Sequence, residues 1–236
     1  MTSNTERISE PRSAITRLCQ KLFKRKKTPP VFSGSADYWE DRYSAGGTSG
    51  AGSYARFAEF KAEILNGFVA DHDVKVVIEF GCGDGNQLKL AKYPEYIGFD
   101  VSSTAVALCQ QTFKSDAHKS FHLVSEYNGQ VADLALSLDV IYHLVEDEVF
   151  EQYMQTLFGA SDKYVIIYAS DSDNNEDLAN PHVRHRKFTQ WIQDNLDSWS
   201  LLEHIPNRYP YRGDHRKGSF ADFFIYAKNR TAAIEK

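Results

Sequence analysis

Val76-Val77-Ile78-Glu79-Phe80-Gly81-Cys82-Gly83-Asp84-Gly85-Asn86-Gln87-Leu88 is the stretch that decides the fold. Its first half contains three β-branched residues in a row, which predicts a buried strand of a parallel sheet. The alternate glycines then allow the backbone to turn tightly and to approach a ligand, since no Cβ is in the way. An apolar helical pattern follows at once, so the loop is predicted to join this strand to a helix over 86–92. In α/β proteins this junction binds nucleotide-like cofactors.

The rest of the chain supports one α/β domain. Its 236 residues, 42% of them hydrophobic, suffice for one sizeable core. Strand-like and helical segments alternate from residue 74 onward, which predicts a mostly parallel sheet covered on both faces. The last two strand-like runs are separated only by a turn-rich loop and are expected to pair antiparallel. Strands are expected at 74–80, 95–99, 120–124, 133–138, 163–169, 199–205 and 220–227, and helices at 86–92, 102–112, 146–158 and 185–196.

Two segments precede this alternation. Residues 37–70 are expected to form a helical lid on a single domain that spans 37–230. Within the lid, an aromatic helix at 38–43 is followed by a glycine-rich stretch at 46–53, which is interpreted as a mobile loop, and by a second helix at 54–69. Residues 1–36 are basic and are predicted to be a flexible tail. An amphipathic basic segment of this kind can also contact an anionic membrane surface.

Charge and cysteine content narrow the class of protein. The net charge is −5 with a pI near 5.9, which disfavours a nucleic-acid binder in general but leaves room for a local basic patch. Cys19, Cys82 and Cys109 are too few and too widely spaced for a disulfide framework or a zinc site, so no metal is expected. No apolar run reaches the length of a membrane span. These features predict a cytoplasmic protein, with peripheral contact at the inner membrane surface as an addition.

Acids at two strand ends indicate which cofactor binds. Asp100 closes the second strand about 20 residues beyond the glycine loop, the spacing at which a carboxylate accepts hydrogen bonds from both ribose hydroxyls. A dinucleotide loop needs a third glycine where this chain has Asn86, and it does not favour an acid such as Glu79 before the turn. A pyrophosphate would be repelled there, whereas an ammonium group would be attracted.

The motif from Glu79 to Gly85 resembles motif I of the class I S-adenosylmethionine-dependent methyltransferases. Asp100 resembles their ribose-binding acid, and the stretch 133–144 resembles their fourth-strand motif. The resemblance covers roughly residues 54–228 and implies a doubly wound, Rossmann-like seven-stranded sheet in the order 3-2-1-4-5-7-6, with the last strand antiparallel. It also implies S-adenosyl-L-methionine as the cofactor. A looser similarity links the aromatic helix and glycine loop to small bacterial members that act on small molecules or sugars.

The resemblance assigns cofactor contacts residue by residue. The glycines would let the backbone approach the cofactor, Glu79 would orient the loop or the aminoacyl end, and Asp100 would hold the ribose. Residues after the second and third strands would contact the adenine, although Glu126 stands where the family often has an aspartate. Leu138 and Asp139 would flank the methionine, and a tyrosine and an arginine could clamp its carboxylate. The cofactor-binding set is Tyr38, Arg42, Glu79, Gly81, Gly83, Gly85, Asp100, Val101, Glu126, Leu138 and Asp139.

The acceptor side is less specific. His143 follows the fourth strand and is the candidate catalytic base, since imidazole titrates near neutral pH. Shaping the cofactor pocket is its alternative role. Two further clusters combine cationic and aromatic side chains that suit an anionic or ring-bearing substrate. The candidate substrate-binding residues are His182, Arg184, His185, Tyr209, Tyr211 and Arg212.

These observations predict methyl transfer to an oxygen of a small polar or anionic acceptor, such as a sugar, a nucleotide sugar or a natural-product intermediate. Nitrogen remains an alternative acceptor atom. A nicotinamide-dependent oxidoreductase is the competing enzyme, and a non-catalytic S-adenosylmethionine-binding or scaffold protein is the competing non-enzyme. The acidic net charge makes nucleic acid the least favoured partner.

Overall fold

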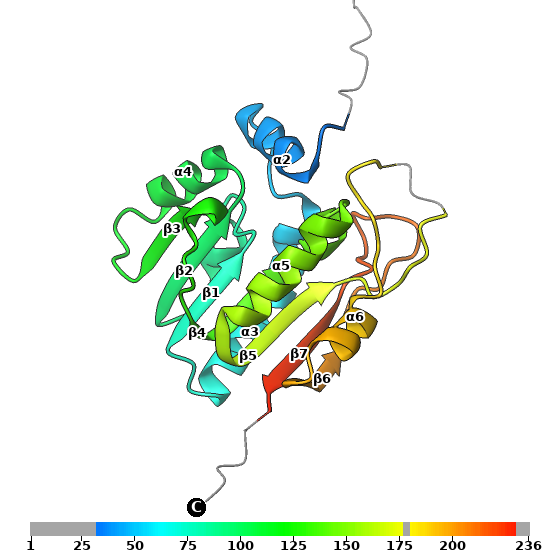
Figure 1. Ribbon diagram of the computed structural model, residues 1–236. Coiled ribbons are helices and arrows are strands. Elements are labelled where there is room, and N and C mark those ends of the chain that lie inside the picture. Colours follow the sequence, from blue (N-terminus) through cyan, green and yellow to red (C-terminus); the bar gives the residue numbers. More distant parts are fainter. Residues whose placement is uncertain (1–31, 177–179, 230–236) are drawn as a thin grey trace, which may run out of the picture. The chain divides into compact units, whose positions relative to one another are not determined.

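The computed structural model describes residues 32–176 and 180–229 (Figure 1). Almost all of the basic segment expected at 1–36 therefore lies outside the described residues, as does the membrane contact predicted for it. Within the described part, no helix is both long and apolar enough to cross a bilayer.

A single seven-stranded sheet organises the chain, in the order β3-β2-β1-β4-β5-β7-β6. Strands β1 to β5 pair in parallel, and β7 runs antiparallel to both of its neighbours, β5 and β6. The predicted fold class, strand order and reversed last strand are confirmed. The strands are β1 Val76–Phe80, β2 Glu95–Asp100, β3 Lys119–Leu123, β4 Ala132–Leu138, β5 Ser161–Ala169, β6 Trp199–Ile205 and β7 Asp222–Lys228.

Helices cover both faces of the sheet, because alternate residues of each central strand point to opposite sides. Val77 and Leu134 face a core built with α3 (Ala55–Asp71) and α4 (Ser103–Thr112). Ile78 and Ala135, one residue further along, face a second core built with α5 (Asp147–Gly159) and α6 (Phe188–Asn195). Figure 1 shows α5 and α6 on the near side of the sheet.

The helix predicted at 86–92 is wrong. The structure has only a short 3-10 helix, η2 (Gln87–Leu90), between β1 and β2. The chain already becomes extended at Ala91, and Tyr93 precedes Pro94, which disfavours a helical conformation. Asn66 of α3 accepts from Lys92 N at 2.8 Å and donates to Leu90 O at 2.9 Å, so α3 supports this connection instead. A helix this short gives the glycine loop little help from a helix dipole.

The N-terminal segment contains α2 (Ser35–Ser44), a 3-10 turn η1 (Ala51–Ser53) and α3. The aromatic helix and the longer helix are present where the sequence predicts them. The stretch 46–53, interpreted as a loop without regular structure, ends in η1. Both α2 and this stretch lie at the carboxyl edge of β1, β2 and β4, where the candidate site is found.

Candidate active site

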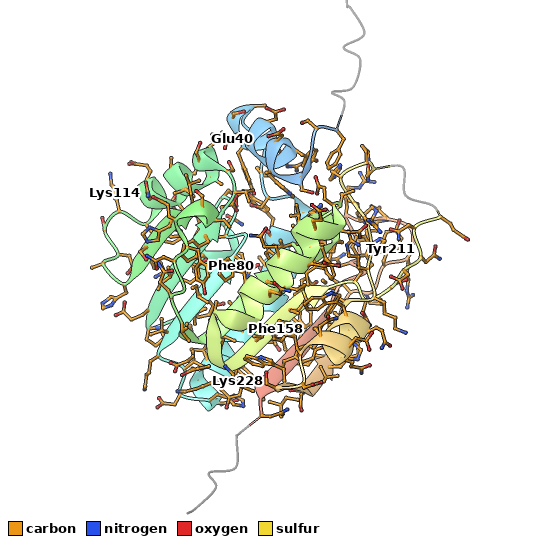
Figure 2. The ribbon with its side chains drawn as sticks, viewed as in Figure 1. Glu40, Phe80, Lys114, Phe158, Tyr211 and Lys228 are labelled. Carbon is orange, nitrogen blue, oxygen red and sulfur yellow. The ribbon has the colours of Figure 1, made fainter. Side chains whose placement is uncertain are left out.

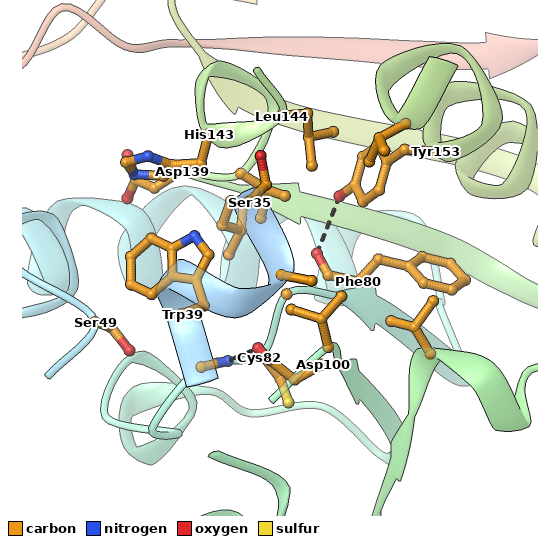
Figure 3. Close-up of a pocket in the computed structure, with 18 of the residues that line it drawn as sticks. Ser35, Trp39, Ser49, Phe80, Cys82, Asp100, Asp139, His143, Leu144 and Tyr153 are labelled. Carbon is orange, nitrogen blue, oxygen red and sulfur yellow. Dashed lines mark hydrogen bonds between the residues drawn. The ribbon is translucent and has the colours of Figure 1, made fainter. Parts of the chain in front are cut away.

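A cavity of about 430 Å³ opens at the carboxyl ends of the central parallel strands (Figure 3). It is lined by residues that follow β1, β2, β3 and β4, and by α2, the 49–53 segment and α5. The volume falls in the range of sites for small ligands and cofactors. Its position at the edge where β1 meets β4 is where the strand order of a doubly wound sheet reverses and ligands bind.

The glycine loop forms the floor of this cavity. Gly81 and Gly83 line it with φ angles of +91° and +57°, which L-residues with a side chain rarely adopt. A Cβ on Gly81 would collide with the Val140 side chain, and one on Gly83 would lie 2.9 Å from the Tyr43 hydroxyl oxygen and collide with Ser49. These two glycines therefore make room for protein side chains that close the cavity. Gly85 is not part of the lining, and it packs against α4.

Asp100 is the acid at the end of β2. It is buried and lines the cavity, and its two carboxylate oxygens each accept a 2.9 Å backbone hydrogen bond, from Gly83 N and from Ser102 N. Burial raises its pKa to about 6 despite these hydrogen bonds. Each carboxylate oxygen keeps a free lone pair for a ligand. Asp100 thus joins the glycine loop to α4 while still facing the cavity.

Glu79, near the end of β1, is a second buried acid of the lining. Its Oε2 accepts a 2.6 Å hydrogen bond from the Tyr96 hydroxyl. Burial raises the pKa of Glu79 to about 7, while the Tyr96 hydrogen bond and the charge of Lys61 act in the opposite direction. A cation bound in the cavity would favour the ionised form of this carboxyl group.

Lys61 and Asp139 form a buried ion pair at the β4 end of the cavity. Lys61 Nζ lies 2.6 Å from Asp139 Oδ2, and the lysine side chain is only 1% exposed. The other carboxylate oxygen of Asp139 accepts from the Tyr142 hydroxyl at 2.7 Å. Asp139 was predicted here, whereas Lys61 was missed. One signal could have revealed it: Lys61 interrupts the apolar face of the helix, four residues after Phe57 and four before Leu65.

The lining of the cavity is strongly acidic. Lys61 is its only lysine or arginine within the described chain. Against it stand six acids, namely Asp37, Glu79, Asp84, Asp100, Asp139 and Glu146. Such a lining attracts a cationic ligand and repels a polyanion.

His143 closes the same end of the cavity, next to Asp139 (Figure 3). Its Nδ1 lies 2.9 Å from the His182 carbonyl oxygen. Because a carbonyl can only accept, Nδ1 carries the proton and Nε2 keeps its lone pair. Burial lowers the pKa of His143 to about 4, so the ring is neutral at pH 7. The Trp39 ring packs edge-on at 4.9 Å.

Helix α2 is fastened across the cavity at two points. Near its start, Ser35 N and Oγ donate to the Glu146 carboxylate at 2.9 and 2.6 Å. Further along, Glu40 accepts hydrogen bonds from the Ser102 hydroxyl at 2.7 Å and the Thr104 hydroxyl at 2.6 Å, at the beginning of α4. These hydroxyl groups lower the pKa of Glu40 to about 2. The helix thereby covers the cavity from the solvent side.

The glycine-rich stretch before α3 is attached to the glycine loop. Ser49 N donates to Asp84 Oδ2 at 3.0 Å, and Asp84 N donates back to Ser49 Oγ at 3.0 Å. The Tyr54 hydroxyl also donates to Asp84 Oδ2, at 2.7 Å. Asp84, a motif residue for which the sequence suggested no role, therefore joins the two loops that face the cavity.

Several predicted cofactor residues lie outside the lining. Arg42 Nε donates to Thr48 O at 2.6 Å and its Nη1 donates to the Tyr38 hydroxyl at 3.2 Å, so this pair holds the turn after α2. Glu126 turns back to accept from Leu123 N at 2.7 Å.

Two other predicted cofactor residues do line the cavity. Val101 lies at its rim and is 48% exposed, whereas Leu138 lines the interior and is buried.

A second cavity, of about 730 Å³, lies between the carboxyl end of β5, α6 and the strands β6 and β7. Its lining includes His185 and Tyr211 from the predicted substrate set, together with His204, His215, Phe220 and Asp222. Tyr211 and Phe80, which lines the first cavity, lie on different sides of α5 in Figure 2. Within the described residues, this lining contains no lysine or arginine.

Tyr142 contacts residues of both cavities. Its hydroxyl is bound to Asp139 of the first cavity, and its ring packs edge-on against Phe220 of the second at 5.1 Å. The His185 ring lies 6.1 Å away from it. A single aromatic side chain thus contacts the lining of both cavities.

The remaining substrate candidates have structural partners. Arg184 Nη1 lies 3.0 Å from Asp147 Oδ1 and donates to Val145 O at 2.9 Å. The Tyr209 ring packs edge-on against Phe57 at 5.8 Å. His182 stacks on Tyr38 at 4.1 Å, beside His143, and Arg212 is exposed in the loop before β7.

No protein-family model and no curated protein sequence matches this chain. Solved structures do. The N-methyltransferase NodS from Bradyrhizobium japonicum WM9, in complex with S-adenosyl-L-homocysteine, matches with a TM-score of 0.64 at 15% identity, over 84% of this chain and 100% of that chain. Magnesium protoporphyrin IX methyltransferase (ChlM) from Synechocystis PCC 6803, with bound S-adenosylmethionine, matches with a TM-score of 0.58 at 17% identity, over 86% and 100%.

The methyltransferase domain of the bacterial protein CtHen1 matches with a TM-score of 0.55 at 19% identity, over 72% of this chain and 97% of that domain. The chain therefore has the Rossmann-like fold of the class I S-adenosylmethionine-dependent methyltransferases, as its sequence motifs imply.

Proposed function

We propose that this protein is an S-adenosylmethionine-dependent methyltransferase. The observation that carries the proposal is the acidic cavity at the carboxyl ends of β1, β2 and β4, with six carboxyl groups around one lysine. S-adenosylmethionine carries a sulfonium, an ammonium and one carboxylate, so its net charge is positive and complements this lining. Three solved structures of the same fold are methyltransferases, and two of them contain S-adenosylmethionine or S-adenosyl-L-homocysteine.

The same lining argues against a nicotinamide dinucleotide. Its pyrophosphate would lie on the glycine loop, close to Glu79, Asp84 and Asp100. The loop also leads into a short 3-10 helix, which offers a phosphate little of the stabilisation found at the start of a long helix. Mixing the protein with NADH and following its fluorescence would test this alternative directly.

In the proposed complex, Asp100 accepts hydrogen bonds from the ribose hydroxyls, and Val101 and Val124 flank the adenine. Gly81 and Gly83 form the floor beneath the chain that links ribose to methionine, and Leu138 packs beside it. When bound, the cofactor supplies an electrophilic methyl group on a sulfonium sulfur. Helix α2 and the Ser49 loop exclude water from the reaction.

The protein's chemical contribution to transfer is at His143. Its Nδ1 is held by the His182 carbonyl, so Nε2 can take the proton from an acceptor hydroxyl as the methyl group is transferred. A ring with a pKa of about 4 is a weak base, and its advantage is that it is neutral over the whole physiological range. The acceptor oxygen must therefore be aligned with the methyl group, since a weak base contributes little and positioning has to provide most of the rate acceleration.

The second cavity is the proposed place for the rest of the acceptor. Tyr211, Phe220 and Phe224 offer apolar faces, while Asn174, Gln193 and Asp222 offer polar groups. No lysine or arginine of the described chain lines it, and Arg184 is paired with Asp147. This chemistry favours an uncharged, hydroxyl-rich acceptor such as a sugar over an anionic one.

Release of S-adenosylhomocysteine against a panel of acceptors tests the proposal. The panel pairs neutral sugars and phenols with their phosphorylated counterparts. Turnover with a neutral hydroxyl acceptor is the expected result. Binding of S-adenosylmethionine without turnover on any acceptor would instead indicate a non-catalytic binding protein.

A further inference from the structure

Lys61 is a buried cation to which the proposed methyl transfer assigns no role. It lies in the apolar face of α3, 1% exposed, with Nζ 2.6 Å from Asp139 Oδ2 and 5.2 Å from the centre of the Tyr168 ring. Removing a lysine and an aspartate from water is unfavourable, and an apolar pair at the same place is often at least as stable. A buried ion pair that also lines a ligand cavity therefore calls for a function.

The partner of Lys61 is held in an unusual conformation. Asp139 has a φ of +60°, although it is not a glycine, and a strained backbone of this kind is common at ligand sites. Its Oδ1 is fixed by the Tyr142 hydroxyl, and the backbone at Gly52 approaches so closely that a Cβ there would lie 2.9 Å from Oδ2. The fold thus positions one carboxylate and one ammonium group at the wall of the cavity.

The ion pair lies at the far end of the cavity from the ribose acid. Asp100 ends β2, and Asp139 follows β4, with β1 and its glycine loop between them. Adjacent strands are about 4.8 Å apart, so the two ends are separated by roughly 10 Å. A nucleoside that carries a short amino-acid substituent spans about this distance, from its ribose to the end of the substituent.

We propose that Lys61 and Asp139 together bind an α-amino-acid zwitterion, the amino-acid end of the nucleoside cofactor. The carboxylate would be bound by Lys61 Nζ and the ammonium by Asp139. This inference rests on the proposed function. The two charges of the protein match the two charges of the ligand, and each group gains a charge-assisted hydrogen bond within a cavity that excludes water. Tyr38 and Arg42, predicted from the sequence to hold the carboxylate, bind each other and Thr48 instead.

Two nucleosides that differ only in this end provide the test. S-adenosylhomocysteine has the amino-acid group, 5′-methylthioadenosine lacks it, and neither carries a sulfonium charge. For the wild-type protein, calorimetry should show S-adenosylhomocysteine binding at least about tenfold more tightly. In Lys61→Met this advantage should fall to about threefold or less, with the affinity for 5′-methylthioadenosine unchanged, because one charge-assisted hydrogen bond accounts for about 10- to 100-fold in affinity.

Lys61→Met leaves Asp139 buried without its counter-ion, which can prevent folding. The double variant Lys61→Met/Asp139→Asn removes both charges and should fold, and it is expected to lose the preference for S-adenosylhomocysteine in the same way. Lys92→Met, which removes an exposed lysine after η2, controls for the change in net charge and should keep the wild-type preference.

A variant that keeps the full preference, or one that weakens both nucleosides equally, would overturn the assignment of Lys61 and leave the proposed cofactor in place. A wild-type protein that binds both nucleosides equally would overturn it as well. If the wild-type protein binds neither nucleoside, the proposed function itself is wrong and the inference fails with it.

Discussion

The two ends of the first cavity are built in different ways. At the β2 end, where the ribose is proposed to bind, Asp100 is fixed by backbone groups at Gly83 and Ser102, all within a short stretch of chain. At the end where the acceptor would enter, His143 is held by the His182 carbonyl and packed by Trp39, which are far away in the sequence. The donor end is therefore encoded by a local motif and the acceptor end by long-range packing.

The largest effect should come from the acceptor end. His143→Ala is expected to lower kcat by about 100- to 1,000-fold, since it removes a proton acceptor. The affinity for S-adenosylhomocysteine should change less than about threefold, because the proposed hydrogen-bond partners of that ligand are Asp100, Lys61 and Asp139 and not His143. Steady-state kinetics and calorimetry on the same preparation separate the two quantities. An equal loss in both would show that His143 only shapes the cavity.

Asp100→Ala should have its main effect at the donor end. Loss of a charged acceptor for the ribose hydroxyls should weaken S-adenosylhomocysteine by about 10- to 100-fold, and it also leaves Gly83 N without its partner. Asp162→Ala, which removes an exposed acid of β5, is the matched control. An affinity for Asp100→Ala equal to that of the control would show that the ribose binds elsewhere.

Gly83→Ala tests the glycine loop at the Asp100 end of the cavity through its effect on the free energy of unfolding. A φ of +57° and the collision with Ser49 should together lower the free energy of unfolding by about 2 kcal/mol or more. Gly129→Ala has a φ of +91° but no heavy atom within 4 Å of the added Cβ, so it isolates the backbone term. Chemical denaturation of both variants should show the larger loss for Gly83→Ala, and an equal loss would remove the steric role of Ser49.

The two ends should also respond differently to pH. The pKa values of Glu79 and Asp100 are raised to about 7 and about 6, so both carboxyl groups become protonated as the pH falls from 7.5 to 5.5. Cofactor affinity should fall by up to about 100-fold over this interval, since the cofactor is expected to bind the form in which both carboxyl groups are ionised. His143, with a pKa of about 4, stays neutral throughout, so kcat at saturating cofactor should stay nearly constant. Calorimetry and kinetics across the interval test both statements, and Glu79→Gln should reduce the change in affinity.

The smallest effect is expected in the second cavity. Tyr211→Ala should raise KM for a neutral acceptor by about three- to tenfold, because it removes one aromatic face from the lining. Arg212→Ala, one residue further and exposed outside that lining, should leave KM unchanged. The reverse order of effects would favour an anionic acceptor bound at the surface loop.

The sequence predicted the sheet, and it indicated that the glycine loop and Asp100 lie together at its edge, because these features depend on short-range signals. Apolar periodicity, the glycine loop and the acid after β2 are read along the chain, and the strand order followed from the family resemblance. The helix at 86–92 failed because Pro94 and the short connection prevail over an apolar pattern. Lys61 was missed because its partner Asp139 is 78 residues away, and only the fold brings them together.

The acceptor side shows the same limit. Arg184 looks like a substrate ligand in sequence, and only the structure shows that Asp147 and Val145 O already bind it. His185 and Tyr211, from separate clusters, line one cavity because the loops after β5 and β6 converge there. The charge pattern of a sequence shows which charged side chains could bind a substrate, but it does not show which of them are already paired with other residues in the folded protein.

A crystal structure of the protein with S-adenosylhomocysteine tests the central claim most directly. The expected result is a nucleoside lying across the carboxyl ends of β2, β1 and β4, with its ribose on Asp100 and its amino-acid end at the ion pair of Lys61 and Asp139. An empty cavity under saturating nucleoside, or a nucleoside bound in the opposite direction, would contradict it.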